Sequence, residues 1–282
     1  MTKEEARAKF AEMVARTESD LELDRAALLI AAEEYPRLDV QFYLDQIGSI
    51  ADLARSRDDL CADPLPRIMR LGDLLFGELG FRGNAENYFD ARNSFLNDVI
   101  DRRTGIPITL SVLYLEIARR IGLKVFGVGL PGHFIVKFAH NEHEILIDPF
   151  NGGRLLTEEK CRELIEEMYR GEMAFHPAFL YAVTKKQILA RMLQNLKGIY
   201  ARACDHHKTL GAIERALLIH SEIGAGVANE IRDRGLVYSG MGRYAPAVAD
   251  LEEYLKLAPQ SPDAKGIEER IRQLRNKQAQ LN

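Results

Sequence analysis

The chain has 282 residues, of which 46% are hydrophobic and 28% are charged, and its formal net charge is −4. These values exclude a disordered chain and are ordinary for a globular protein of about two domains. The N-terminus is charged and no apolar run reaches about 18 residues, so we expect no signal peptide, no membrane span and a cytoplasmic location. Cys61, Cys161 and Cys204 are widely spaced, which predicts reduced thiols and no disulfide framework.

The first part of the chain is predicted to be helical. Apolar residues recur at intervals of three and four, which predicts helices over residues 4–16, 24–34, 39–56, 63–80, 92–103 and 107–121. The helix over 63–80 has prolines in its first turn and a glycine at its end, the usual asymmetry of helix ends. The glycine- and asparagine-rich segment FRGNAENYFD, 81–90, is expected to be a loop.

The character of the sequence changes after Gly122. Three short runs rich in β-branched and aromatic residues follow, KVFGVGLP, HFIVKF and EILIDP, and they predict a meander of three antiparallel strands. His133 begins the second run and Asp148 ends the third, so the two side chains are expected to lie side by side. Helical periodicity returns at Thr157, a good helix cap, and we place the domain boundary near residue 183, giving domains 1–182 and 183–282.

The last hundred residues predict a stack of helices. A tetratricopeptide pattern fits residues 228–262, with matched positions at Gly235, Tyr238, Gly242, Tyr244, Ala247, Leu251 and Pro259. Helices over about 185–204 and 208–222 would form a preceding, more degenerate pair, and 264–279 reads as a polar capping helix. Such repeats predict a surface for an unknown protein or peptide.

The residues of the central block resemble a known family. The segments NSFLNDVIDRRTGIPITLSVLYLEIARRIGL, GVGLPGHFIVKF and ILIDPFNGG resemble transglutaminase-like proteins of the bacterial Sir-B type, in which such a core precedes tetratricopeptide repeats. The strong match covers about 88–160. The resemblance implies an α+β fold that is mostly helical: a papain-like core with a small antiparallel sheet, followed by an all-α repeat domain.

The resemblance also implies positions for a Cys-His-Asp triad. In the wider superfamily the cysteine begins the central helix, the histidine starts one strand and the aspartate ends the next, which places His133 and Asp148 in the last two positions. Counting back about four turns from Gly122 places the nucleophile position at or beside Pro107. Proline has no nucleophilic atom, so the ordinary thiol chemistry is not expected.

Two classes of function therefore stay open. The first is a non-catalytic or catalytically altered protein that binds a protein or peptide, in a regulatory role, through a cleft around His133 and Asp148 and through the repeats. Further cleft residues would be Tyr88, Asn93, Asn97, Arg103 and Pro107. The second is a hydrolase or acyltransferase acting on an amide or ester, with His133 as general base and Asp148 orienting it. Ser111 or an unexpected cysteine would then replace the missing nucleophile, and of the cysteines only Cys61 could plausibly fold near the block.

No cofactor, metal or nucleic acid is expected. The sequence has no phosphate loop, zinc spacing or nucleotide fingerprint. His140 and His143 lie in a predicted hairpin turn and are expected to be solvated. The small basic surplus of the C-terminal third is far too weak to indicate nucleic-acid binding.

Overall fold

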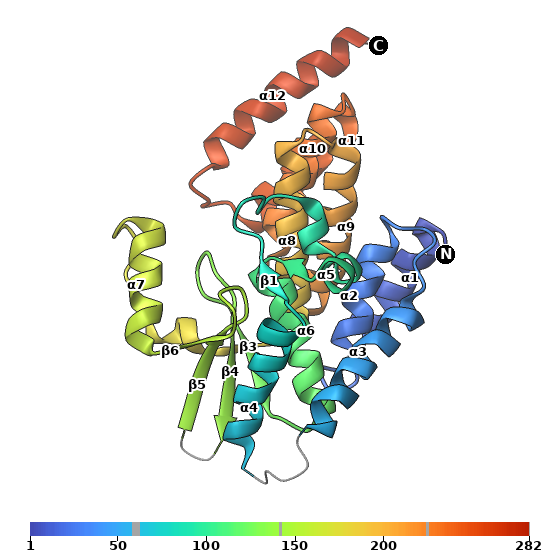
Figure 1. Ribbon diagram of the computed structural model, residues 1–282. Coiled ribbons are helices and arrows are strands. Elements are labelled where there is room, and N and C mark those ends of the chain that lie inside the picture. Colours follow the sequence, from blue (N-terminus) through green and yellow to red (C-terminus); the bar gives the residue numbers. More distant parts are fainter. Residues whose placement is uncertain (58–62, 141–142, 224–225, 282) are drawn as a thin grey trace. The chain divides into compact units, whose positions relative to one another are not determined.

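The computed structural model describes residues 1–57, 63–140, 143–223 and 226–281 (Figure 1). Cys61 and the side chains of His140 and His143 lie outside the described part. The chain forms two compact units, Met1–Met192 and Leu193–Asn282, so the division falls inside helix α8 (Lys185–Arg202). The boundary predicted near residue 183 lies directly before this helix. Within the described residues, no helix is long and apolar enough to cross a membrane.

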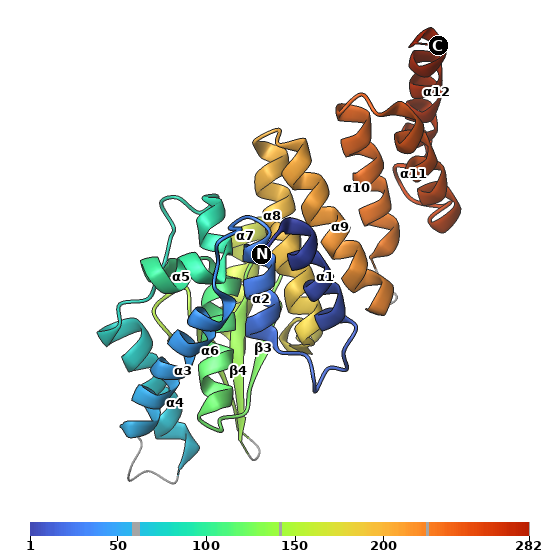
Figure 2. The ribbon, with the colours of Figure 1, turned by 90° about the vertical axis from the view of Figure 1, so that its right-hand side faces the viewer.

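Helices make up the first third of unit 1, and α2 (Leu23–Ala32) is their centre. It packs against α1 (Lys3–Val14) and α3 (Val40–Ser56), as Figure 2 shows, and also against α5 (Leu96–Arg102) and α6 (Pro107–Arg120). Every residue of α2 except Arg25 is buried, which explains why its sequence is apolar on nearly all sides. Asp24 is the one charged residue among the buried residues of α2, and it forms an ion pair with Arg120 of α6.

The helix ends follow the local chemistry of the sequence. Thr2 caps α1 in a reciprocal arrangement with Glu5, and Asp39 caps α3. The predicted helix over 63–80 is α4 (Pro64–Gly72), capped by Asp63 and continued by the π-helix η1 (Asp73–Glu78). A short 3₁₀ turn, η2 (Ala91–Ser94), leads into α5.

The sheet of unit 1 has two more strands than the sequence predicts. Its order is β6-β5-β4-β3-β7, and every neighbouring pair is antiparallel. The three predicted strands are β3 (Val125–Val128), β4 (Ile135–His140) and β5 (His143–Asp148). The edge strands β6 (Arg154–Leu156) and β7 (Ala182–Val183) are too short to show an alternating pattern. The predicted α+β class with a small antiparallel sheet is confirmed.

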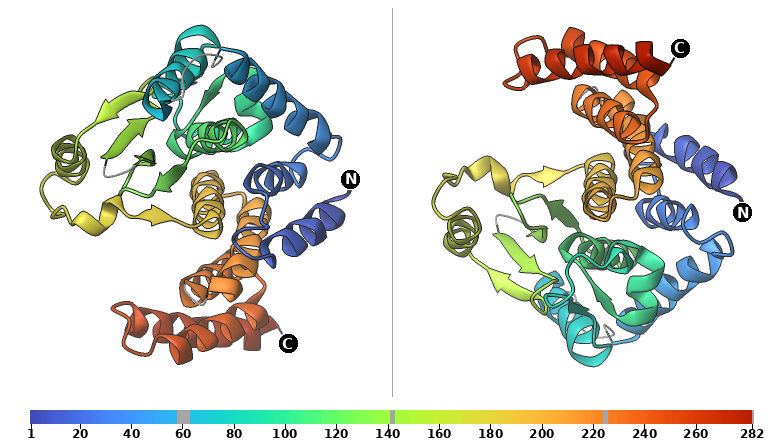
Figure 3. Two further views of the ribbon diagram at one scale, coloured as in Figure 1. Left: turned by 90° about the horizontal axis from the view of Figure 1, so that it is seen from below. Right: turned by 90° about the horizontal axis from the view of Figure 1, so that it is seen from above.

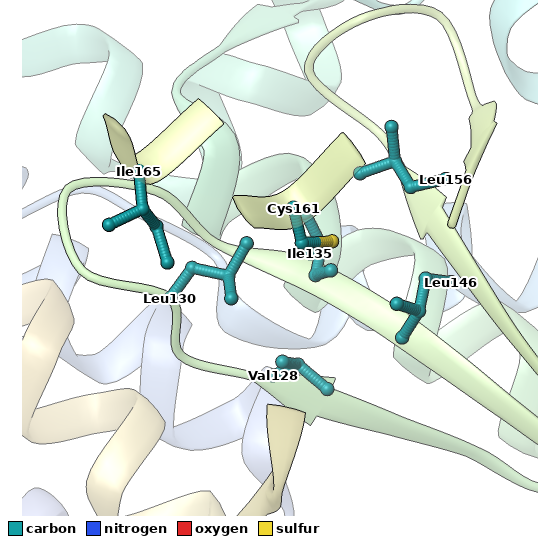
Figure 4. Packing of buried hydrophobic residues seen from close by; sticks show 7 residues of the cluster. All are labelled: Val128, Leu130, Ile135, Leu146, Leu156, Cys161 and Ile165. Carbon is teal, nitrogen blue, oxygen red and sulfur yellow. The ribbon is translucent and has the colours of Figure 1, made fainter. Parts of the chain in front are cut away.

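Helices cover both faces of this sheet (Figure 3). The central helix α6 packs on β3 and β4. On the other face, α7 (Glu158–Tyr169) contributes Cys161 and Ile165 to an apolar cluster with side chains of the sheet and its turns (Figure 4), namely Val128, Leu130, Ile135, Leu146 and Leu156. A separate parallel pair, β1 (Arg82–Gly83) with β2 (Thr104–Gly105), lies before α6. The 3₁₀ turn η3 (Pro177–Leu180) precedes β7.

Unit 2 contains the predicted repeat. Helices α10 (Val227–Gly240) and α11 (Tyr244–Leu257) follow α9 (His206–Ile223) and precede α12 (Ala264–Leu281). A Cβ at Gly235 would lie 3.0 Å from Leu251 Cγ, so glycine permits the close approach of α10 and α11. The tetratricopeptide prediction is confirmed, and its small residues lie where the two helices touch.

Candidate functional site

The strands place His133 and Asp148 next to each other. His133 follows a turn in which its N–H donates to the Leu130 carbonyl and Gly132 has a φ of +71°, a conformation that favours glycine. β4 begins two residues later and pairs with β5, which ends at Asp148. His133 Nε2 lies 2.9 Å from Asp148 Oδ2. The pair is almost covered, since His133 is 8% exposed and Asp148 is 0% exposed.

Asp148 is held as a carboxylate by several donors. Its Oδ1 accepts from the N–H groups of Phe150 and Asn151, and its Oδ2 also accepts from Asn151 Nδ2 at 2.7 Å. Burial alone would raise the pKa of Asp148. The hydrogen bond and charge of His133, and the hydrogen bonds from Asn151, have a larger effect in the opposite direction, so the pKa lies below its ordinary value. An ionised carboxylate only accepts, so His133 Nε2 is the donor. His133 Nδ1 has no hydrogen-bond partner among the described residues.

Arg191 fixes the turn that carries His133. It lies in α8, and its Nη2 donates to the carbonyl oxygens of Leu130 at 2.9 Å and His133 at 2.7 Å. The guanidinium also lies 5.5 Å from the centre of the Phe134 ring. Burial lowers the pKa of Arg191 from its ordinary value. No sequence signal indicated this residue, because it lies far along the chain in a helix read as part of the repeats.

Phe150 connects the pair to Tyr88. The centre of its ring lies 6.1 Å from those of both His133 and Tyr88, in edge-on geometry. A Cβ at Gly83 would lie 2.5 Å from the Phe150 carbonyl oxygen and 2.6 Å from its ring, so only glycine fits beneath this segment. Tyr88 is half-buried, and burial raises the pKa of its phenol. The ring of Phe150 therefore borders the histidine, and the ring of Tyr88 lies against Phe150.

The position that the family resemblance gives to the nucleophile holds Pro107. This residue is buried and begins α6, where a missing N–H costs no helical hydrogen bond. Ser111 is also buried, and its Oγ has no hydrogen-bond partner among the described residues, His133 included. The structure does not bring Ser111 Oγ within hydrogen-bond distance of the pair.

The described thiols offer no replacement. Cys161 belongs to the apolar cluster under α7, and burial, with the charges of Asp148 and Glu158, raises its pKa to about 11 (Figure 4). It is therefore a neutral thiol at pH 7, whereas a thiolate is the nucleophile. Cys204 is exposed and belongs to unit 2.

The remaining predicted residues have other surroundings. Asn93 is buried and donates through Nδ2 to the Asn87 carbonyl at 2.7 Å, so it holds the loop before η2. Arg103 ends α5 in the left-handed conformation and donates to the Leu79 carbonyl at 2.8 Å. Asn97 lines a different cavity. Only Tyr88 among the predicted polar cleft residues is linked to His133 by contacts of the described side chains.

The fold is that of a transglutaminase-like protein, and the comparisons agree. The family model of the transglutaminase-like superfamily matches residues 41–194, and a tetratricopeptide-repeat model matches residues 196–272. The chain therefore belongs to the transglutaminase-like superfamily and continues into a repeat region.

The chain is also similar to individual bacterial and human proteins. The chain is similar to the UPF0162 protein of Xylella fastidiosa strain Temecula1, at 35% identity over 93% of each chain. It is also similar to the UPF0162 protein of Pasteurella multocida, at 28% identity over 82% of this chain and 85% of that one. Human F-box only protein 21 is 36% identical over 46% of this chain and 21% of its own length. No solved structure gave a significant match. The finer likeness to the Sir-B type stays a prediction.

Proposed function

We propose that this protein is a binding member of the transglutaminase-like superfamily, without amide-bond chemistry of its own. The observation that carries the proposal is Pro107 at the start of α6, the position that the family resemblance gives to the nucleophile, in a chain that keeps the His133–Asp148 pair. The pair keeps its hydrogen bond and its ionised carboxylate. A triad without its nucleophile can orient and bind a polar group, but it cannot form a covalent acyl intermediate.

The chemistry around His133 favours a peptide as ligand. His133 Nδ1 has an unused lone pair when the ring is neutral, so it can accept an N–H from a peptide backbone. The ring of Phe150 provides apolar surface beside it, and the ring of Tyr88 lies against that of Phe150. Unit 2 supports the same class of ligand, because tetratricopeptide repeats stack into surfaces that bind proteins and peptides. A regulatory role through such binding is part of the proposal.

The rival function is hydrolysis or acyl transfer with Ser111 as nucleophile. It requires Ser111 Oγ to reach His133, and the hydroxyl is instead buried without a partner. A serine that is not within about 3 Å of its base is not activated by it. The intact pair is the only observation in favour of this alternative, so we place it second.

One experiment separates the two functions. The purified full chain is incubated with a glutamine-rich protein and a fluorescent primary amine, and a parallel sample is checked for peptide cleavage. We expect no product above that of His133→Ala or Ser111→Ala. Product formed by the wild type and lost in both variants would establish the enzyme instead.

Binding is then measured directly. The labelled full chain is screened on an array of short peptides, and each peptide bound is tested by hydrogen exchange on the intact protein. Protection is expected at 130–133 and 148–151, on the repeat helices, or on both. Peptides that bind His133→Ala equally well, without protecting either region, would contradict the proposal.

A further inference from the structure

A second cavity in unit 1 has the chemistry of a separate binding site. It has a volume of about 700 Å³ and lies between the segment that follows α2, the start of α3 and one face of α5. The residues that decide its chemistry are Tyr35, Phe42, Tyr43, Asn97, Asp98 and Asp101. The residues around His133 do not contribute to it.

Negative charge dominates the lining. Asp98 and Asp101 are three residues apart on α5 and therefore project from the same face of the helix. Each accepts one phenol, Tyr35 Oη at 2.6 Å and Tyr43 Oη at 2.7 Å, but neither forms an ion pair with any described residue. Glu34 and Asp39 add two further carboxyl groups, against the single guanidinium of Arg37.

The carboxylate of Asp98 is poorly compensated. Burial raises its pKa above the ordinary value, and the charge of Asp101 acts in the same direction. The hydrogen bond from Tyr35 and the charges of Arg102 and Arg92 lower the pKa but do not reverse the shift. A positive charge placed between Asp98 and Asp101 would remove this penalty, because an opposite charge stabilises the ionised form.

Asn97 supplies an independent sign of an unfilled site. Its side chain lines the cavity and the residue is only 5% exposed, yet its Oδ1 is buried without a hydrogen-bond partner among the described residues. Buried polar groups are nearly always paired, which indicates that another group completes this one.

The aromatic lining defines the kind of cation. Tyr35, Tyr43 and Phe42 line the cavity, and Phe42 is 50% exposed although it is a large apolar side chain. Ring faces attract guanidinium and ammonium groups. No group of three or more metal-ligating side chains occurs anywhere in the described residues, which argues against a bare metal ion as ligand.

We propose that the cavity between α3 and α5 binds an organic cation, the guanidinium or ammonium group of an arginine or lysine side chain on a partner peptide. Asp98 and Asp101 would carry the charge recognition. Asn97 would complete the polar contacts, and Phe42 and Tyr43 would cover the cation. This site goes beyond the binding proposed for His133, and it lies on other elements, so either proposal can fail without the other.

The test is a titration of the full chain followed by NMR. The probes are N-acetyl-arginine amide and N-acetyl-lysine amide, which distinguish the two cations, and neutral N-acetyl-citrulline amide. At about 10 mM, above the millimolar affinity expected of one side chain, the charged probes should shift the Asn97 side-chain amide and the backbone signals of 35–43 and 97–101. Citrulline should leave them unchanged.

Isosteric variants then test the carboxylates. Asp98→Asn and Asp101→Asn should each weaken binding of the preferred cation about tenfold or more, because a charged hydrogen bond is lost. Glu167→Gln removes one exposed carboxylate of α7 and should leave the affinity unchanged. Asp101→Asn decides the matter if Asp98→Asn disturbs the fold. Equal binding of citrulline, no shift with either cation, or unaltered affinity in Asp101→Asn would overturn the proposal.

Discussion

Arg191 Nη2 lies 2.7 Å from the carbonyl oxygen of His133, and the same nitrogen lies 2.9 Å from that of Leu130. One guanidinium thus closes the turn that presents His133, while Asp148 holds the ring itself. The orientation of the imidazole is set from two sides, by a cation acting on the backbone and by an anion acting on Nε2.

Replacing Arg191 should destabilise the turn from Leu130 to His133. We expect Arg191→Met to lower the free energy of unfolding by about 1–3 kcal/mol, because two carbonyl oxygens lose a charged donor in a largely buried place. Urea unfolding measures the loss, and the imidazole NMR signals of His133 should broaden or shift. Arg82→Met is the matched control, since Arg82 is exposed and its side chain has no partner among the described residues. Equal effects of both substitutions would contradict the assigned role.

Asp148→Asn should reduce stability in a pH-dependent way. Because the pKa of Asp148 is lowered in the folded protein, its contribution is fully present above its unfolded pKa of about 3.9 and is lost as the pH falls through the folded value. The wild type should therefore exceed the variant by about 1.5–3 kcal/mol at pH 7, and the difference should shrink below pH ~4. Urea unfolding at pH 7, 5 and 3 checks this. A difference that grows on acidification would show that the sign is wrong.

Pro107→Cys should create a reactive thiol. A cysteine at the start of α6 gains from the helix N-terminus and, if the position is that of the family nucleophile, from His133. In a chain with Cys61 and Cys204 replaced by serine, we expect alkylation by iodoacetamide with an apparent thiol pKa below the ordinary value of about 8.5. His133→Ala should raise that pKa. Ser111→Cys, buried within α6, should stay unreactive. A thiol pKa that is the same with and without His133 would show that position 107 does not belong to the site.

Gly83→Ala should displace Phe150. The new Cβ would lie 2.5 Å from the Phe150 carbonyl oxygen, and overpacking of this kind costs about 1–3 kcal/mol. The segment 148–151 would move, which the His133 NMR signals should report. Gly48→Ala offers the control, because it lies inside α3 with nothing within 4 Å and should stabilise the helix by about 0.5–1 kcal/mol. Thermal unfolding of both variants tests the contrast.

The sequence was informative where local chemistry sets the structure. The proline at 107 marks the first residue of α6. The two β-branched runs form the adjacent strands β4 and β5, with His133 two residues before β4 and Asp148 at the end of β5. The edge strands β6 and β7 were missed because three and two residues cannot display a period. Their pairing depends on the sheet beside them.

The surroundings of His133 could be predicted only in part. Asn151 belongs to the family-like segment ILIDPFNGG, yet its hydrogen bond to Asp148 depends on the conformation of the turn. Arg191 reaches His133 only through the packing of α8 against the sheet turn, a relation without a signature in either segment. Asn97 was expected near His133 from its place in the family-like block, but a helix points its residues in several directions, and Asn97 faces the other cavity.

The proline at the start of α6 has a consequence for redox behaviour. A catalytic thiolate is the group that oxidants and alkylating agents attack first, and the enzyme loses activity when this thiolate is oxidised to a sulfenic or sulfinic acid. Pro107 cannot undergo these reactions, and His133 and Asp148 carry no sulfur that could be oxidised in this way. The ligand binding that we propose for the pair should therefore persist under oxidative conditions that inactivate a cysteine-dependent enzyme.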